Sequence, residues 1–142
     1  MISITQFCEK HSACADGREW ALANCRDMQH AWDTLKPDWL LWVATRPGVL
    51  TDRDIRLFAV WCARQVQHLM TDPRSIAALD VAERHASNQA TDDELAAARA
   101  AAWDAAGDAA GDAAWDAAWD AARTAQAAWL RANTQPDFGG AQ

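Results

Sequence analysis

Hydrophobic residues recur at three- and four-residue steps along most of this chain, and no stretch shows sustained two-residue alternation of β-branched residues. This spacing predicts an all-α protein. Most breaks in the pattern carry residues that begin or end helices. We therefore expect a single-domain helical bundle of about six helices, with a long C-terminal helix rich in alanine and aspartate.

Three helices are expected in the Cys- and Trp-rich N-terminal part, residues 1–46. The first has the capping-box pattern of Ser3 and Gln6, and the third begins at Pro37, because proline fits the first turn of a helix. The expected spans are residues 4–15, with an end near Gly17, then 16–32, and then 37–45.

Two core helices are expected in residues 51–90. The first, over 51–70, has apolar positions with the helical period and is predicted to be the central core helix. These positions are Ile55, Phe58, Ala59, Cys62, Val66 and Leu69. The second begins at Asp72-Pro73 and ends around residues 87–89.

A long helix is predicted over 91–132, because Thr91 and Glu94 form a capping box and only Gly107 and Gly111 interrupt the helical pattern after it. The segment 133–142 contains Pro136, Gly139 and Gly140 and is expected to be a flexible tail. The domain is therefore expected to span residues 1–132.

Five four-residue units of the form Trp/Gly-Asp-Ala-Ala follow one another from residue 103 to residue 122. On a helix each unit advances by about 6 Å and about 40° around the axis, so the aspartates form a slowly winding acidic row. We predict that this row and two neighbouring tryptophans bind a partner. The predicted partner-binding residues are Asp104, Asp108, Asp112, Asp116, Asp120, Trp115 and Trp119.

Three other interpretations of the repeat stay open. Gly107 and Gly111 leave a notch between bulky tryptophans, where another helix could pack closely, and this arrangement would suit a homodimer. A repetitive alanine-rich helix with a solvated charged face is an equally simple interpretation. Carboxylates at this spacing could also imitate the phosphates of a nucleic-acid strand.

The charge of the chain narrows the class of partner. The net charge is −7, and 51% of the residues are hydrophobic. This balance disfavours direct nucleic-acid binding and favours a basic protein partner. No stretch has the length and apolarity of a membrane span, and the first residues do not resemble an export signal, so a cytoplasmic protein without membrane association is expected.

Cysteine and histidine residues near the N-terminus form a second candidate site. Cys8, His11, Cys14 and Cys25 have the ligand types and a spacing that suit structural zinc. The same spacing also arises when small residues line the buried side of a helix, which is the default interpretation. Apart from this candidate zinc ion, no cofactor is predicted.

The chain carries no pattern typical of a catalytic site. The four histidines lie on different expected helices, and neither a nucleophile elbow nor a glycine-rich phosphate loop is present. We therefore expect a protein that is not an enzyme. Nine tryptophans and no tyrosine indicate a core built largely from indole rings.

A resemblance adds to these expectations. The stretch 72–79, then 82–86, then the capping box 91–95 and the Ala-rich units that follow resemble the bacterial and phage immunity-protein group of small Ala-rich helical domains. The resemblance covers roughly residues 51–130. It implies neutralisation of a toxin or host-defence protein by stoichiometric binding, and it brings no catalytic residues. The alternatives are a self-associating structural helical module and a phage-encoded anti-defence protein that mimics nucleic acid.

Overall fold

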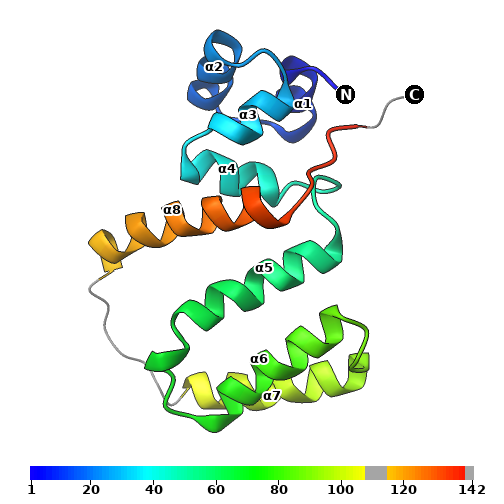
Figure 1. The fold of residues 1–142 in the computed structure, drawn as a ribbon, viewed down its shortest axis with the longest axis vertical. Helices are drawn as coiled ribbons and strands as arrows, with labels where there is room; N and C mark the ends of the chain where they lie inside the picture. The colour runs from blue at the N-terminus through cyan, green and yellow to red at the C-terminus, as the bar shows by residue number, and fades with distance from the viewer. Residues whose placement is uncertain (108–114, 140–142) are drawn as a thin grey trace. The chain divides into compact units, whose positions relative to one another are not determined.

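The chain is all-helical in the part that the computed structural model describes, which is residues 1–107 and 115–139, without the side chains of 102–120 (Figure 1). The predicted fold class is confirmed. The elements are α1 (Ile4–His11), α2 (Ala15–Asn24), α3 (Met28–Thr34), α4 (Pro37–Ala44), α5 (Asp52–Gln65), the 3-10 turn η1 (Gln67–Leu69), α6 (Pro73–Ala86), α7 (Asp92–Gly107) and α8 (Trp115–Asn133).

The helices form two compact units, where the sequence predicted a single domain over 1–132. Unit 1 comprises Met1–Thr51 together with Asp116–Gln142, and unit 2 comprises Asp52–Trp115. Unit 1 therefore joins the two ends of the chain, and unit 2 is inserted between them in the sequence.

Unit 1 contains most of the buried hydrophobic side chains of the described residues. Trp32, Leu40 and Leu130 are its largest fully buried side chains, so α3, α4 and α8 meet in one core. The guanidinium group of Arg131 on α8 donates hydrogen bonds to the carbonyl oxygens of Trp32, at 2.8 Å, and Leu35, at 2.6 Å. These bonds hold α8 against the end of α3.

The C-terminal segment contradicts the prediction of a flexible tail over 133–142, at least as far as residue 139. Phe138 is only 5% exposed, and its ring packs edge-on against Phe7 and Trp32. The Ile2 amide donates to the Phe138 carbonyl, and the Asp137 amide donates to the carbonyl of Val49. Because two hydrogen bonds and a buried ring hold it, this segment belongs to the core of unit 1.

Several helix starts follow the residues that predicted them. Ser3 and Gln6 form the expected reciprocal capping box, and Pro37 occupies the first turn of α4. The Asp72 carboxylate accepts a hydrogen bond from the Arg74 amide at the start of α6. Side-chain acceptors and proline satisfy or remove the free amides of a first turn, so these starts were readable from sequence.

The helix over 16–32 is wrong as one element, because α2 ends at Asn24 and α3 begins at Met28. Asp27 starts α3 by accepting a hydrogen bond from the His30 amide. The end of the first helix was also placed too late. Ser12 terminates α1 with a left-handed φ of 54°, several residues before Gly17.

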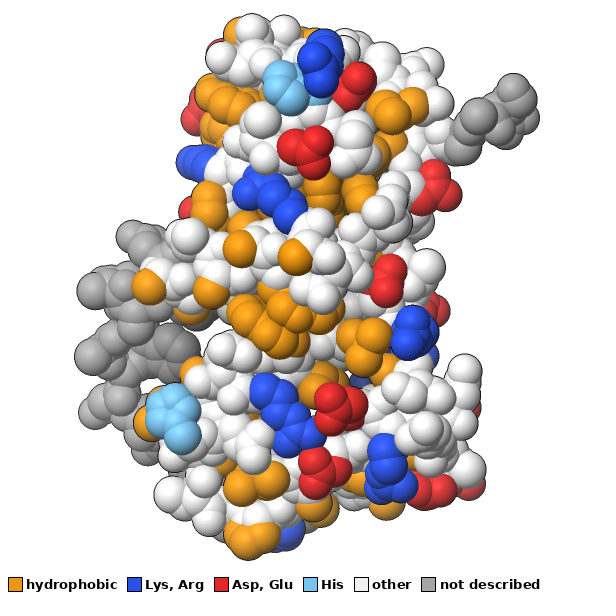
Figure 2. Space-filling view, viewed as in Figure 1, with side chains coloured by type: hydrophobic (Ala, Val, Ile, Leu, Met, Phe, Trp, Pro, Cys, Tyr) orange, Lys and Arg blue, Asp and Glu red, His pale blue; other side chains and the backbone are white. Residues whose placement is uncertain are grey.

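Unit 2 consists of α5, η1, α6 and α7, and its described residues bury few side chains. The expected central core helix is wrong, since Val60 is the one buried residue of α5. Ile55, Val66 and Leu69 are exposed, Leu69 at 69%. On the face that Figure 2 shows, acidic and basic side chains of this unit are interspersed with hydrophobic ones.

The predicted helix over 91–132 is helical over α7 and α8, and residues 108–114 between them lie outside the described part, so its continuity is untested. No helix in the described part of the chain combines the length and apolarity needed to cross a membrane.

Candidate functional site

The acidic repeat keeps its helical backbone on both sides of residues 108–114, in α7 and in α8. The side chains of 102–120 lie outside the described part, and so does everything in 108–114. The predicted binding residues Asp104, Asp108, Asp112, Asp116, Asp120, Trp115 and Trp119 and the predicted notch at Gly107 and Gly111 fall in this region. These assignments therefore stay predictions.

The described part of α8 shows how one end of the repeat is held. Ala127 and Leu130 are buried in unit 1, and Arg123 forms an ion pair with Asp38 of α4. Arg123 is one of two arginines that lie near the repeat in the sequence, the other being Arg99. The guanidinium charge of Arg123 therefore contributes to the contact between α8 and α4.

The four predicted zinc ligands are distributed over different surroundings. Cys8 and Cys14 line one pocket of unit 1, whereas His11 and Cys25 line two other hollows. His11 packs on the Phe7 ring at 4.5 Å, and the Cys25 sulfur lies 3.6 Å from the hydroxyl of Thr34. Among the described residues, no group of three or more His, Cys, Asp or Glu side chains is arranged to hold a metal ion. The geometry gives the zinc prediction no support.

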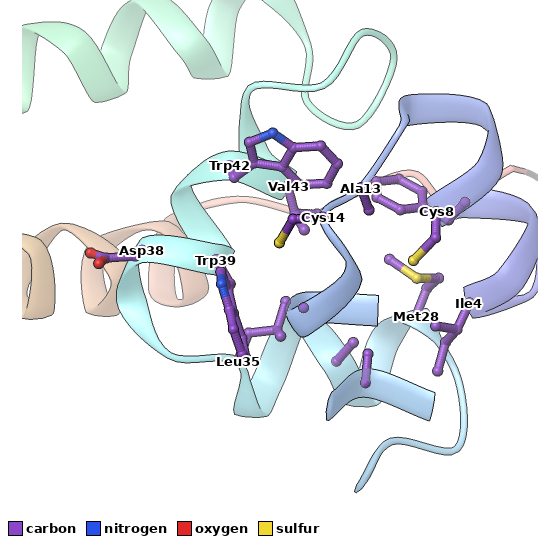
Figure 3. A pocket seen from close by; sticks show the side chains of 14 residues that line it. Ile4, Cys8, Ala13, Cys14, Met28, Leu35, Asp38, Trp39, Trp42 and Val43 are labelled. Carbon is purple, nitrogen blue, oxygen red and sulfur yellow. The ribbon is translucent and has the colours of Figure 1, made fainter. Parts of the chain in front are cut away.

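The pocket that Cys8 and Cys14 share lies within unit 1. It has a volume of about 280 Å³ and lies among α1, α2, α3 and α4. Figure 3 shows the indoles of Trp39 and Trp42 on one side, Cys8 and Met28 on the other, and Cys14 between them. Its walls are almost entirely apolar, so it is suited to an uncharged ligand.

Two tryptophans of α4 form the aromatic wall, three residues apart and therefore on neighbouring positions of one helix face. The Lys36 ammonium lies 4.1 Å from the centre of the Trp39 ring, and the Arg46 guanidinium lies 4.6 Å from that of Trp42. Trp39 also packs against Trp20, at 5.8 Å. These contacts fix the orientation of both indoles.

The thiols of the pocket differ in exposure. Cys8 is buried, and this burial raises the pKa of its thiol, so at neutral pH Cys8 stays uncharged. Cys14 is exposed, although it lines the same pocket. A methyl group at Gly17 would lie 3.3 Å from the Cys14 sulfur and 3.7 Å from the Trp39 ring. Glycine therefore lets α2 approach these two side chains closely.

One charged side chain lies at the edge of the pocket. Asp38 lines the pocket, but its carboxylate accepts a hydrogen bond from Arg123. In Figure 3 the Asp38 carboxylate points away from the indole of Trp39. The negative charge of Asp38 is thus already paired within unit 1.

Contacts within their own units hold His11, His30 and His85. His30 accepts a hydrogen bond from the Arg26 amide, and His85 lies 2.6 Å from the Asp92 carboxylate between α6 and α7. Burial, with smaller contributions from Lys10 and Arg46, lowers the pKa of His11. In these described contacts no histidine is paired with a serine or cysteine nucleophile.

Sequence reasoning missed the pocket. Trp39 and Trp42 are neighbours on one helix face, and Cys8 and Cys14 are two of the four residues that the sequence suggests as zinc ligands, but nothing in the sequence indicates that these side chains share a cavity. The cavity itself arises from the way in which four short helices meet. No spacing within a single helix encodes that arrangement.

The chain was also compared with known proteins. No family model, no curated protein and no solved structure matches it.

Proposed function

We propose that this chain is a non-enzymatic binding protein of the immunity or inhibitor type, acting in the cytoplasm. In this proposal it neutralises a basic toxin or host-defence protein by stoichiometric binding through the acidic repeat of residues 103–122. The observation that carries the proposal is the concentration of negative charge in that repeat, compared with the rest of the chain.

Many of the described acidic residues of unit 2 lie beside a basic side chain. Arg64 pairs with Asp80 and Glu83, at 2.7 and 3.0 Å, and Arg84 lies 3.7 Å from Glu94. Such local pairing weakens the field that an approaching molecule meets.

The repeat has five aspartates and, nearby in sequence, only Arg99 and Arg123. Because no Lys or Arg stands within residues 103–122, the repeat is the part of the sequence with the largest excess of negative charge. Charge of one sign along a helix speeds association with an oppositely charged surface and makes binding sensitive to salt.

The anchoring of α8 supports the proposal in a second way. Ala127, Leu130 and Arg131 fix the second half of this helix in unit 1. Asp116 and Asp120 belong to the first half of the same helix. A binding surface that continues a fixed helix loses less conformational entropy on association than a free segment would.

The test is a pull-down with the purified protein as bait at low and high salt, comparing two variants of equal charge change. Asp108→Lys with Asp112→Lys alters the repeat, and Glu9→Lys with Glu19→Lys alters exposed acidic positions of α1 and α2. We expect one basic protein that is released by salt, lost with the repeat variant and kept with the control.

Two results would overturn the proposal in favour of its alternatives. Recovery of the bait alone, as a salt-insensitive oligomer that Gly107→Leu or Gly111→Leu disrupts, would indicate a self-associating helical module. A captured protein that duplex DNA displaces from the repeat would indicate a nucleic-acid mimic. Equal loss of binding in both charge variants would also contradict a specific role for the repeat.

A further inference from the structure

We propose that the pocket among α1, α2, α3 and α4 binds a small, neutral aromatic molecule with two fused rings, such as an indole or a naphthalene. The pocket belongs to unit 1 and is lined by residues of 4–43, so this inference does not depend on the acidic repeat. It rests on the size of the cavity, the chemistry of its walls and its access to solvent.

The size of the cavity sets the size of the ligand. Its volume is about 280 Å³. A closed apolar cavity of about 150 Å³ is sufficient to bind one benzene ring. The pocket therefore has room for a second fused ring, while it lies near the lower end of the range of about 300–1,000 Å³ that is typical of drug-sized ligands.

The walls select an aromatic ligand. Phe7, Trp39 and Trp42 offer ring faces and edges, and aromatic pairs gain stability beyond the area that they bury. Met28, Cys8 and Cys14 add sulfur atoms, which make favourable contacts with aromatic rings. A saturated molecule of the same size would fill the space without these two kinds of contact.

The charges around the pocket select a neutral ligand. Asp38 is paired with Arg123, and burial keeps the Cys8 thiol protonated. The nearby cations Lys36 and Arg46 lie over the indole rings of Trp39 and Trp42. A charged ligand would therefore lose its hydration without gaining an oppositely charged partner.

Cys14 marks the access to the pocket. Its side chain lines the cavity, and yet the residue is exposed to solvent. A ligand can thus enter beside Cys14 without the opening of a helix. A bound ligand would cover the same thiol.

Binding is tested by titrating naphthalene and indole into the full chain with 13C-methyl methionine labelling. The chain has three methionines, and Met28 is the one that lines the pocket. We expect saturable shifts of the Met28 methyl signal, while those of Met1 and Met70 stay in place. Decalin, which has the same two-ring size without aromaticity, and 2-naphthoate, which is charged, are expected to bind at least about tenfold more weakly.

Two alanine-to-leucine variants of α2 test whether the ligand binds in this pocket. Ala21 lines the pocket, and Ala23 on the same helix is exposed. Ala21→Leu fills the cavity and should lower the affinity by at least about tenfold, the effect of one misfitted methylene in an apolar pocket. Ala23→Leu should bind like the parent protein. If Ala21→Leu does not fold, Ala13→Leu blocks the same pocket from the segment between α1 and α2.

Alkylation gives a second readout. Saturating naphthalene should slow the reaction of Cys14 with iodoacetamide and leave the rate of Cys62, in unit 2, unchanged. The absence of a Met28 shift up to the solubility limit of naphthalene and indole would overturn the proposal. Equal affinity of the Ala21→Leu protein, or equal binding of decalin, would do the same.

Discussion

Asp72 has two roles at the start of α6. One oxygen of its carboxylate accepts a hydrogen bond from the Arg74 amide at 2.9 Å, and the other pairs with the Arg74 guanidinium at 2.6 Å. The side-chain hydrogen bond from Arg74 is the largest cause that lowers the pKa of Asp72, from 3.8 to about 2. The folded chain therefore favours the ionised form of this carboxyl group.

The lowered pKa predicts how stability depends on pH. The contribution of Asp72 is fully present above its unfolded value near 3.8, and it is lost as the pH falls toward about 2. Asp72→Asn keeps a capping side chain but removes the charge. We expect a lower Tm than the parent at pH 7 and a difference that shrinks between pH 4 and pH 2, measured by thermal melts. A constant difference across this range would contradict the assignment.

Phe138 is the residue that turns the C-terminal segment into part of the core. Its ring centre lies 5.9 Å from that of Phe7 and 6.2 Å from that of Trp32. Removal of a buried phenylalanine side chain costs about 3–5 kcal/mol. Phe138→Ala should therefore lower the stability of unit 1 by about that amount in urea melts, while Phe138→Leu should retain most of it. An unchanged midpoint for Phe138→Ala would restore the view of a loose tail.

For single residues, the sequence indicates which chemistry a side chain could support, but it does not indicate what surrounds that side chain in the fold. The sequence groups Cys8 and Cys14 with His11 and Cys25 as zinc ligands, but thiols that suit a metal also suit an apolar wall, and the spacing does not distinguish the two. Phe138 was overlooked because it stands among Pro136, Gly139 and polar residues, a composition typical of loops. Only contacts with distant residues such as Phe7 decide that it is buried.

Among the elements, α8 is linked to the end of α3 by the side chain of Arg131, in addition to the apolar contacts of the core. Helix ends leave carbonyl groups without partners, and Arg131 satisfies those of Trp32 and Leu35. Its pKa is lowered because burial disfavours the guanidinium charge. The two carbonyl groups therefore obtain hydrogen-bond donors from Arg131, and the buried guanidinium group obtains acceptors in place of water.

Replacement of Arg131 by methionine removes the hydrogen bonds between α8 and the end of α3. Arg131→Met keeps the apolar stem but loses two charged hydrogen bonds, each worth about 1.5–3 kcal/mol. We expect unit 1 to lose about 3–6 kcal/mol in urea melts, and Arg131→Lys to lose less, because a lysine can still donate to one carbonyl. A methionine variant as stable as the parent would show that α8 is held by its apolar contacts alone.

Helix starts were predicted more accurately than the role of each helix. Ser3, Pro37 and Asp72 act on their own first turns, so local sequence is sufficient. The division between α2 and α3 was missed, although Asp27 is a typical capping residue. The apolar face of α5 was read as a central core, but period alone shows an amphipathic helix and does not say how much covers it.

For the whole molecule, the described residues of the two units differ in how many side chains they bury. The largest fully buried side chains, Trp32, Leu40 and Leu130, all belong to unit 1. The buried side chains of the described part of unit 2 are Val60, Ala86 and Leu95. Since burial of apolar area supplies most of the folding free energy, unit 2 should open at a lower free energy than unit 1.

Hydrogen exchange measured by mass spectrometry tests this difference. We expect amides of α5 and α6 to be at least about a hundredfold less protected than those of α3, α4 and the end of α8, a gap of about 3 kcal/mol. Val60→Ala should further lower protection in unit 2 alone, whereas Leu130→Ala should lower it in unit 1, because each removes a buried contact of its own unit. Equal protection in both units, with both variants acting on the entire chain, would mean that they unfold together. The chain would then behave as the single cooperative domain that its sequence predicts.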